Sequence, residues 1–203
     1  MTTTVSLLRH GETMANREGL VLGTSDAPLT KVGRFQATMA AKTIAGFKTD
    51  ALFSSPYNRA KETASYIQTV TDLSPVFLDD LREMNSGEME GSDASRMKEL
   101  YPSYLSQWKK DPANTRPPGG ETLGEVHERA WNACQWVSKK NPNNHVVIVS
   151  HLFPIQGIIC RSLGLNSAHY SKIKLDLGSI SKIIFEDNDA FVVNINDTCH
   201  LTS

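Results

Sequence analysis

Cysteine is scarce in this sequence, with only Cys134, Cys160 and Cys199 among 203 residues. An odd number of cysteines, without a Cys-x-x-Cys pair or zinc-ligand spacing, indicates neither a disulfide framework nor a structural metal site. We therefore expect all three to be buried as reduced thiols.

Long apolar runs and a charge excess of either sign are also absent. No stretch approaches the roughly 18 apolar residues of a transmembrane helix, and the first residues lack a cationic, apolar signal segment. The formal net charge of −1 argues against bulk electrostatic binding to nucleic acid or to an anionic membrane. We expect a cytoplasmic protein with neither of these partners, in which local cations bind any anionic substrate.

Length and patterning predict one α/β domain over residues 1–203. A hydrophobic content of 39% allows a chain of this length to bury a substantial core. Short apolar runs alternate with segments of helical period, which favours a three-layer sandwich: a mostly parallel central sheet with helices on both faces. The runs at 181–185 and 191–195 flank Glu186-Asp187-Asn188-Asp189, which predicts an antiparallel C-terminal hairpin.

Helical periodicity and capping residues predict four main helices, at 30–46, after Pro56, at 122–140 and at 154–164. In the first, the residues expected to face the sheet are Val32, Phe35, Met39 and Ile44.

Residues 92–118 carry a short amphipathic helix and several aromatic residues. We interpret this segment as a cap over the functional site. Its Tyr101, Tyr104 and Trp108 are expected mainly to pack.

Two apolar runs end in histidine, and they suggest where a site lies. Residues 5–8 lead into Arg9, His10 and Gly11, and residues 145–150 lead into His151. Because open α/β sheets bind ligands at the carboxyl ends of parallel strands, we expect the two imidazoles to converge on one ligand. The alternative for each is a hydrogen-bonded histidine at a strand end.

The two histidine motifs belong to a longer series of short motifs with characteristic spacing along the chain. They are Leu8-Arg9-His10-Gly11-Glu12-Thr13, Asn16, Gly23, Asp26, Pro28-Leu29-Thr30, Ser54-Ser55-Pro56, Arg59, Leu81-Arg82-Glu83, Gly87, Glu90-Gly91, Gly119-Gly120-Glu121-Thr122 and Val149-Ser150-His151. Together they resemble the histidine phosphatase superfamily, also called phosphoglycerate-mutase-like, over nearly the whole chain.

The resemblance implies a phosphomonoesterase that needs no metal or other cofactor and acts on a small phosphorylated metabolite, with phosphoserine as one candidate. His10 would be the nucleophile, forming a phosphohistidine that water then hydrolyses. Arg9, Arg59 and His151 would cradle the phosphoryl oxygens, a task that suits the planar, permanently charged donor fork of arginine. Outside this cradle, the sequence shows no cluster of His, Cys and carboxylates typical of a metal site.

The departing alkoxide needs a proton donor, and Glu83 is the candidate. The family places its acid in a Leu-x-Glu segment before a Gly-x-x-Glu-Gly stretch, which matches residues 81–91. Glu88 and Glu90 remain alternatives, as does a surface salt bridge for Glu83.

Five residues are candidates for substrate binding. By resemblance, Asn16 and the backbone near Gly23 would donate to the phosphoryl group, although Asn16 also fits a turn-forming role. Leu22 and Leu152 depart from the residues usual in the family and suggest an apolar side to the pocket. His200, in a tail similar to that of metal-independent phosphoserine phosphatases, would either reach the pocket or lie in solvent.

Two alternative functions stay open. A phosphoglycerate mutase is disfavoured because the mutases resembled here are longer, with an extra insertion where this chain has only residues 92–118. A non-catalytic protein that binds a phospho-ligand on the same fold is the other alternative, because fold does not fix function. The oligomeric state is open, with a homodimer as one alternative.

Overall fold

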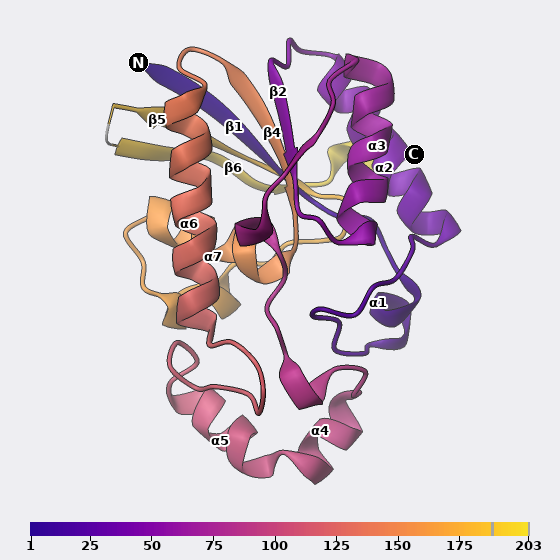
Figure 1. Ribbon diagram of the computed structural model, residues 1–203, viewed down its shortest axis with the longest axis vertical. Coiled ribbons are helices and arrows are strands. Elements are labelled where there is room, and N and C mark those ends of the chain that lie inside the picture. Colours follow the sequence, from indigo (N-terminus) through magenta and orange to yellow (C-terminus); the bar gives the residue numbers. More distant parts are fainter. Residues whose placement is uncertain (188, 203) are drawn as a thin grey trace.

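The computed structural model describes residues 1–187 and 189–202, and it contains a six-stranded sheet with helices on both faces (Figure 1). The strands are β1 (Thr2–Arg9), β2 (Ala51–Ser54), β3 (Val76–Phe77), β4 (His145–Ser150), β5 (Ile180–Glu186) and β6 (Asp189–Asp197). Their order is β3-β2-β4-β1-β5-β6, in which β1 to β4 are parallel while β5 and β6 form an antiparallel hairpin. The predicted fold class is confirmed, although Asn188 of the predicted hairpin turn lies outside the described residues.

The helices begin and end close to the predicted signals. They are α1 (Met14–Glu18), α2 (Lys31–Ala45), α3 (Asn58–Thr71), α4 (Ala94–Leu100), α5 (Pro102–Lys110), α6 (Leu123–Lys140) and α7 (Leu152–Ser162), with short 3-10 turns η1 (Asp79–Leu81), η2 (Gly87–Met89), η3 (Ser167–Lys172) and η4 (Cys199–Leu201). The side chains of Thr30 and Thr122 cap α2 and α6, as predicted. In the part of the chain that the structure describes, every helix is too short or too polar to cross a membrane.

The central strands are apolar on both faces because helices cover both. Side chains alternate along a strand, so Val5 and Leu7 of β1 pack with α6 and α7, whereas Leu8 packs with α2 and α3. Figure 1 shows α6 on one side of the sheet and α2 with α3 on the other, while α4 and α5 lie together beyond one end of it.

The buried face of α2 differs from the predicted one. Ile44 is buried, but Val32 and Phe35 are 44% and 45% exposed. Gly33 and three alanines form the rest of the buried face, and this small surface lets the helix approach the chain closely. A Cβ added at Gly33 would lie 2.1 Å from the carbonyl oxygen of Glu12. The spacing of apolar residues thus predicted the helix correctly, but it did not predict which of its residues pack against the rest of the protein.

The cysteine expectation is correct for two residues and wrong for the third. Cys134 and Cys160 are buried in the core between the sheet and α6 with α7. Cys199 is exposed, because it begins the short η4 turn after the edge strand β6.

The contact between α6 and α7 is tightest at Gly157. A Cβ added there would lie 2.7 Å from three atoms of His127, including its Cα. His127 is buried, and its Nδ1 lies 2.9 Å from the hydroxyl of Ser167. The two helices can therefore meet only if position 157 has no side chain.

Gly157→Ala should lower the free energy of unfolding by about 1–3 kcal/mol, the usual cost of overpacking. Alanine favours a helix by up to about 1 kcal/mol over glycine, but the clash with the Cα and the ring of His127 outweighs this gain. Urea unfolding would measure the difference. Ser162→Ala, in the same helix, is the control and should change stability by less than about 0.5 kcal/mol. A Gly157→Ala protein as stable as the parent would contradict this account of the contact.

Candidate active site

The two predicted histidines lie side by side at the carboxyl ends of β1 and β4. These strands pair in parallel, with Arg9 opposite Ser150, so that His10 and His151 follow at the same edge of the sheet. The backbone N–H of His10 donates to the carbonyl of Ser150 at 3.0 Å. The ring centroids of the two imidazoles are 5.0 Å apart. The fold therefore brings the two imidazoles together, and their convergence on one ligand stays a prediction.

His10 is held as a neutral imidazole with one nitrogen left available. Its ring is 3% exposed, and Nδ1 lies 2.8 Å from the carbonyl oxygen of Gly11. Because a carbonyl can only accept, we assign the hydrogen to Nδ1, which leaves the lone pair on Nε2. Burial, reinforced by the charges of Arg59 and Arg9, lowers the pKa of His10 well below its usual value. The ring is therefore unprotonated at neutral pH and can act as a nucleophile.

Arg59 is fully buried in the first turn of α3 and connects three parts of the site. Its Nη2 and Nη1 donate to the carbonyl oxygens of Gly23 and Ser25 at 2.7 and 2.9 Å, and its Nε donates to Nδ1 of His151 at 3.1 Å. A guanidinium has five N–H groups, so two remain for an anion. Burial lowers the pKa of Arg59, with Glu83 opposing the shift, but arginine remains protonated in proteins.

His151 positions Arg59 in this structure. Its Nδ1 accepts from Arg59, so the ring hydrogen is on Nε2, which lies 2.7 Å from the hydroxyl of Ser55. Burial, followed by the charge of Arg59, lowers its pKa well below the usual value. Donation from His151 to phosphate oxygens stays a prediction, and it would require the Nε2–H of this ring to leave the hydroxyl of Ser55.

Arg9 carries a buried donor without a partner. One guanidinium nitrogen, Nη1, donates to the carbonyl of Leu175 at 2.5 Å. Its Nε is buried and has no hydrogen-bond partner among the described residues. Burial lowers the pKa of Arg9, and Glu83 and Asp176 act in the opposite direction. A buried donor of this kind is a group that a bound anion would satisfy.

Glu83 lies at the N-terminus of α7 as a buried carboxyl. Its Oε2 accepts from the backbone N–H of Leu152 at 3.0 Å, and its Oε1 accepts from that of Met84 at 2.9 Å and that of Phe153 at 3.3 Å. Burial raises the pKa of Glu83, although the Met84 hydrogen bond and the charges of Arg59 and Arg9 oppose the shift. The carboxyl therefore retains its proton to a higher pH than an exposed glutamate, as a general acid requires.

Glu90, an alternative acid, holds a loop instead. Its two carboxylate oxygens accept from the backbone N–H groups and hydroxyls of Thr24 and Ser25. Burial opposes the shift, but these hydrogen bonds lower the pKa of Glu90. An ionised carboxylate is a poor proton donor. Glu88, the other alternative, does not line the cavity described next.

A cavity of about 220 Å³ opens beside His10. The predicted site residues that line it are Arg9, His10, Asn16, Leu22, Glu83 and Leu152. A neutral imidazole, a guanidinium and a buried carboxyl group thus line one cavity. In the part of the chain that the structure describes, no group of three or more His, Cys, Asp and Glu is arranged to hold a metal ion.

Asn16 caps a helix beside the cavity, and its donation to a phosphoryl group stays a prediction. Its Oδ1 accepts from the backbone N–H and the hydroxyl of Thr13 at 3.1 and 2.9 Å, which forms the capping box of α1. This bond uses the oxygen of Asn16 and leaves its NH₂ group as the donor beside the cavity.

The other predicted site residues, Arg59, His151, Gly23 and His200, do not line this cavity. The carbonyl of Gly23 binds Arg59, and a Cβ at this position would lie 2.5 Å from Glu90 and from the carbonyl of Met84, so close packing explains the glycine. The Nε2 of His200 lies 2.9 Å from the carbonyl of Gly178. The N–H of Gly178 in turn donates to the carbonyls at positions 9 and 10, so the tail supports the nucleophile segment from behind.

Three residues that support the site received no role from the sequence. Ser55 bonds His151, and the hydroxyl of Thr63 accepts from the backbone N–H of Gly11 at 3.2 Å. Arg129 donates to the backbone carbonyls at positions 80, 82 and 83, which fixes the segment carrying the acid. Ser55 lay within a motif that could have identified it, whereas Arg129 lay in an ordinary amphipathic helix.

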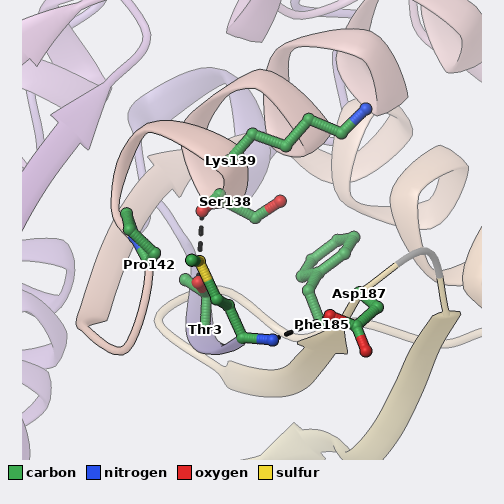
Figure 2. Close-up of a pocket in the computed structure, with 7 residues that line it drawn as sticks. Thr3, Ser138, Lys139, Pro142, Phe185 and Asp187 are labelled. Atoms are coloured by element: carbon green, nitrogen blue, oxygen red, sulfur yellow. Dashed lines mark hydrogen bonds and ion pairs between the residues drawn. The ribbon is translucent and has the colours of Figure 1, made fainter.

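A different cavity, of about 280 Å³, lies at the opposite end of β1 and is drawn in Figure 2. There the N-terminal ammonium of Met1 bonds Asp187, and the hydroxyl of Thr3 donates to the carbonyl of Ser138 at 3.1 Å. No histidine or arginine is among the described residues that line it. The histidine and arginine side chains of the candidate site therefore lie at the carboxyl ends of the strands, and not beside this other cavity.

Arg59→Lys should lower the free energy of unfolding by about 2–4 kcal/mol, because lysine keeps the charge but cannot bind two carbonyls and an imidazole at once. Urea unfolding would measure the loss. Arg34→Lys is the matched control: Arg34 is half exposed and its Nε contacts Glu62, so this change should cost less than about 1 kcal/mol. Equal effects of the two substitutions would refute the connecting role of Arg59.

Comparisons with known proteins agree with this geometry. The sequence profile of the histidine phosphatase superfamily (branch 1) matches residues 5–198. Phosphoserine phosphatase 1 of Hydrogenobacter thermophilus is 30% identical over 195 residues, which are 96% of this chain and 92% of that protein. Among solved structures, Bacillus stearothermophilus YhfR superposes with a TM-score of 0.93 at 26% identity, over 98% of this chain and 99% of that chain. The Entamoeba histolytica phosphoserine phosphatase in complex with 3-phosphoglyceric acid gives a TM-score of 0.89 at 27% identity, with the same coverage. This chain belongs to branch 1 of the histidine phosphatase superfamily and is a phosphatase, a hydrolase of phosphoric monoesters.

Proposed function

We propose that the protein is a metal-independent phosphomonoesterase that acts through a phosphohistidine on His10. The observation that carries the proposal is the state of this side chain: Nδ1 is tied to Gly11, the ring is neutral, and Nε2 is available beside a buried guanidinium with an unused donor. Covalent catalysis of this kind replaces one difficult displacement by two easier ones.

In the first step, the lone pair of His10 Nε2 attacks phosphorus while the bond from phosphorus to the ester oxygen breaks. The departing alkoxide takes the proton of Glu83. In the second step, water attacks the phosphohistidine, the phosphorus–nitrogen bond breaks, and the Glu83 carboxylate takes a proton from that water. Inorganic phosphate leaves, and both side chains return to their initial states. Arg9 and Arg59 stabilise the charge on the peripheral oxygens throughout.

The proposed substrate is a small phosphorylated metabolite, since the cavity beside His10 measures about 220 Å³. Phosphoserine is the first compound to test, because it is the substrate named for relatives of this chain. We further propose that residues 1–203 act as one domain and that residues 92–118, which contain α4 and α5, cap the site.

His10→Ala should abolish the phosphoenzyme and lower turnover by at least about 10³-fold, because no other group can carry the phosphoryl group. Single-turnover reaction with a radiolabelled phosphomonoester, quenched in alkali, would measure the acid-labile phosphate on the protein. His145→Ala is the control, since His145 begins β4 at the far end of the sheet. Substantial activity of His10→Ala on phosphomonoesters would contradict the mechanism.

Glu83→Gln should slow hydrolysis of an alkyl phosphate by about a hundredfold or more, the usual effect of losing a general acid. p-Nitrophenyl phosphate should be affected much less, because its phenolate departs without a proton. The acid acts while protonated, so the parent rate on the alkyl phosphate should fall as pH rises through the raised pKa of Glu83. This falling limb should be absent from the variant.

Glu88→Gln is the control for this test, because Glu88 lies outside the cavity in the same segment. An equal loss on both substrates in Glu83→Gln would assign Glu83 to positioning. A loss confined to alkyl phosphates in Glu88→Gln would move the acid to that residue.

A further inference from the structure

A second cavity, of about 180 Å³, adjoins the one beside His10. The two share Val21, Ser86 and Phe153 in their walls. The remaining wall includes Met84 and Met97 together with residues of α5, and no charged side chain of the described residues lines it. The combined space falls in the range of small-molecule sites, about 300–1,000 Å³.

The acid lies at the junction between these cavities. The carboxyl of Glu83 faces the first cavity, and the next residue, Met84, lines the second. Phe153 lines both, and its backbone N–H donates to Glu83. When phosphorus is at His10 and the ester oxygen is at Glu83, the carbon part of the substrate therefore points toward the second cavity.

The aromatic wall of the second cavity is preformed. Trp108 of α5 donates from Nε1 to the hydroxyl of Tyr170 at 2.6 Å, and its ring lies edge-on to those of Tyr170 and Phe153. Buried Gln156 of α7 donates to the backbone carbonyl of Tyr170 at 3.0 Å. These contacts hold the α5 segment against the rest of the protein. A rigid wall loses little entropy when a ligand binds.

The chemistry of this wall favours apolar ligands. Burial raises the pKa of Tyr104, another wall residue, which marks a poorly hydrated environment. The ammonium and carboxylate of a serine moiety would lose water there and meet no opposite charge. An apolar chain, in contrast, gains roughly fourfold in binding for each methylene that it buries.

We propose, on the basis of the phosphatase activity proposed above, that the second cavity binds the alcohol part of the substrate. It selects phosphate monoesters of apolar alcohols, alkyl or arylalkyl, over phosphoserine.

A series of substrates with equally basic leaving groups tests this selection: ethyl, butyl, hexyl and 2-phenylethyl phosphate, with phosphoserine for comparison. Because their alkoxides are alike, differences in kcat/KM report contacts to the carbon chain. We expect kcat/KM to rise by up to roughly fourfold per buried methylene, with hexyl phosphate at least about tenfold above both ethyl phosphate and phosphoserine. A series that stays flat or falls with chain length would overturn the proposal.

Met97→Glu places a carboxylate in the wall and should lower the hexyl-to-ethyl ratio of kcat/KM at least about fivefold. The ratio is compared within each variant, so a change in the shared phosphoryl step cancels. Leu100→Glu is the matched control: it lies on the same helix, is 51% exposed and does not line the cavity, so it should keep the parent ratio. A parent-like ratio in Met97→Glu would also overturn the proposal.

Binding of non-hydrolysable alkylphosphonates separates this inference from the activity on which it rests. Calorimetry should show hexylphosphonate binding at least about tenfold more tightly than ethylphosphonate, with a more negative heat-capacity change. Absence of turnover on every monoester would refute the phosphatase mechanism, whereas phosphonate affinity independent of chain length would refute the apolar subsite.

Discussion

The parallel pairing of β1 with β4 is the constraint on which the site depends. Its register places Arg9 opposite Ser150, so the next residues, His10 and His151, leave the sheet at the same edge. A shift by one residue would turn every side chain of a strand to the other face and separate the imidazoles. Apolar residues on both faces hold this register, since each face is covered by its own pair of helices. The geometry of the site thus depends on the apolar core, although the site residues themselves are not part of that core.

Burying two guanidinium groups beside two imidazoles is costly, and the surrounding structure offsets the cost in different ways. The histidines remain neutral, so they add no positive charge. Arg59 is solvated by backbone carbonyls, whereas Arg9 retains an unpartnered Nε. Glu83 is the nearby opposite charge, yet burial favours its protonated form. These side chains consequently give the site excess positive potential, and a dianionic phosphoryl group is a ligand that would neutralise it.

Much of the fold was predictable because its signals are local. Thr30 and Thr122 cap helices where predicted, and the apolar runs ending at His10 and His151 are adjacent strands. Contacts between distant segments were harder: Arg129 supports the acid segment from another helix, and α2 packs through small residues instead of through Phe35. The period of apolar residues indicates whether a segment is a helix or a strand. Which of its residues pack closely depends on the segments that the fold places beside it. The role of His200 was unresolved for the same reason, because only the folded chain brings it to Gly178.

In the proposed mechanism, acid catalysis and substrate selection depend on the same residues. Leu152 and Phe153 donate their backbone N–H groups to the Glu83 carboxyl, and both residues also line the cavity. Burial raises the pKa of Glu83, and the same apolar side chains would contact the substrate in the proposed mechanism. A more polar pocket would therefore admit water, lower the pKa of the acid and weaken protonation of the leaving group. If the proposed mechanism holds, apolar residues such as Leu22 and Leu152 in the cavity wall would therefore tune substrate preference and acid strength together, because both depend on how much water the cavity admits.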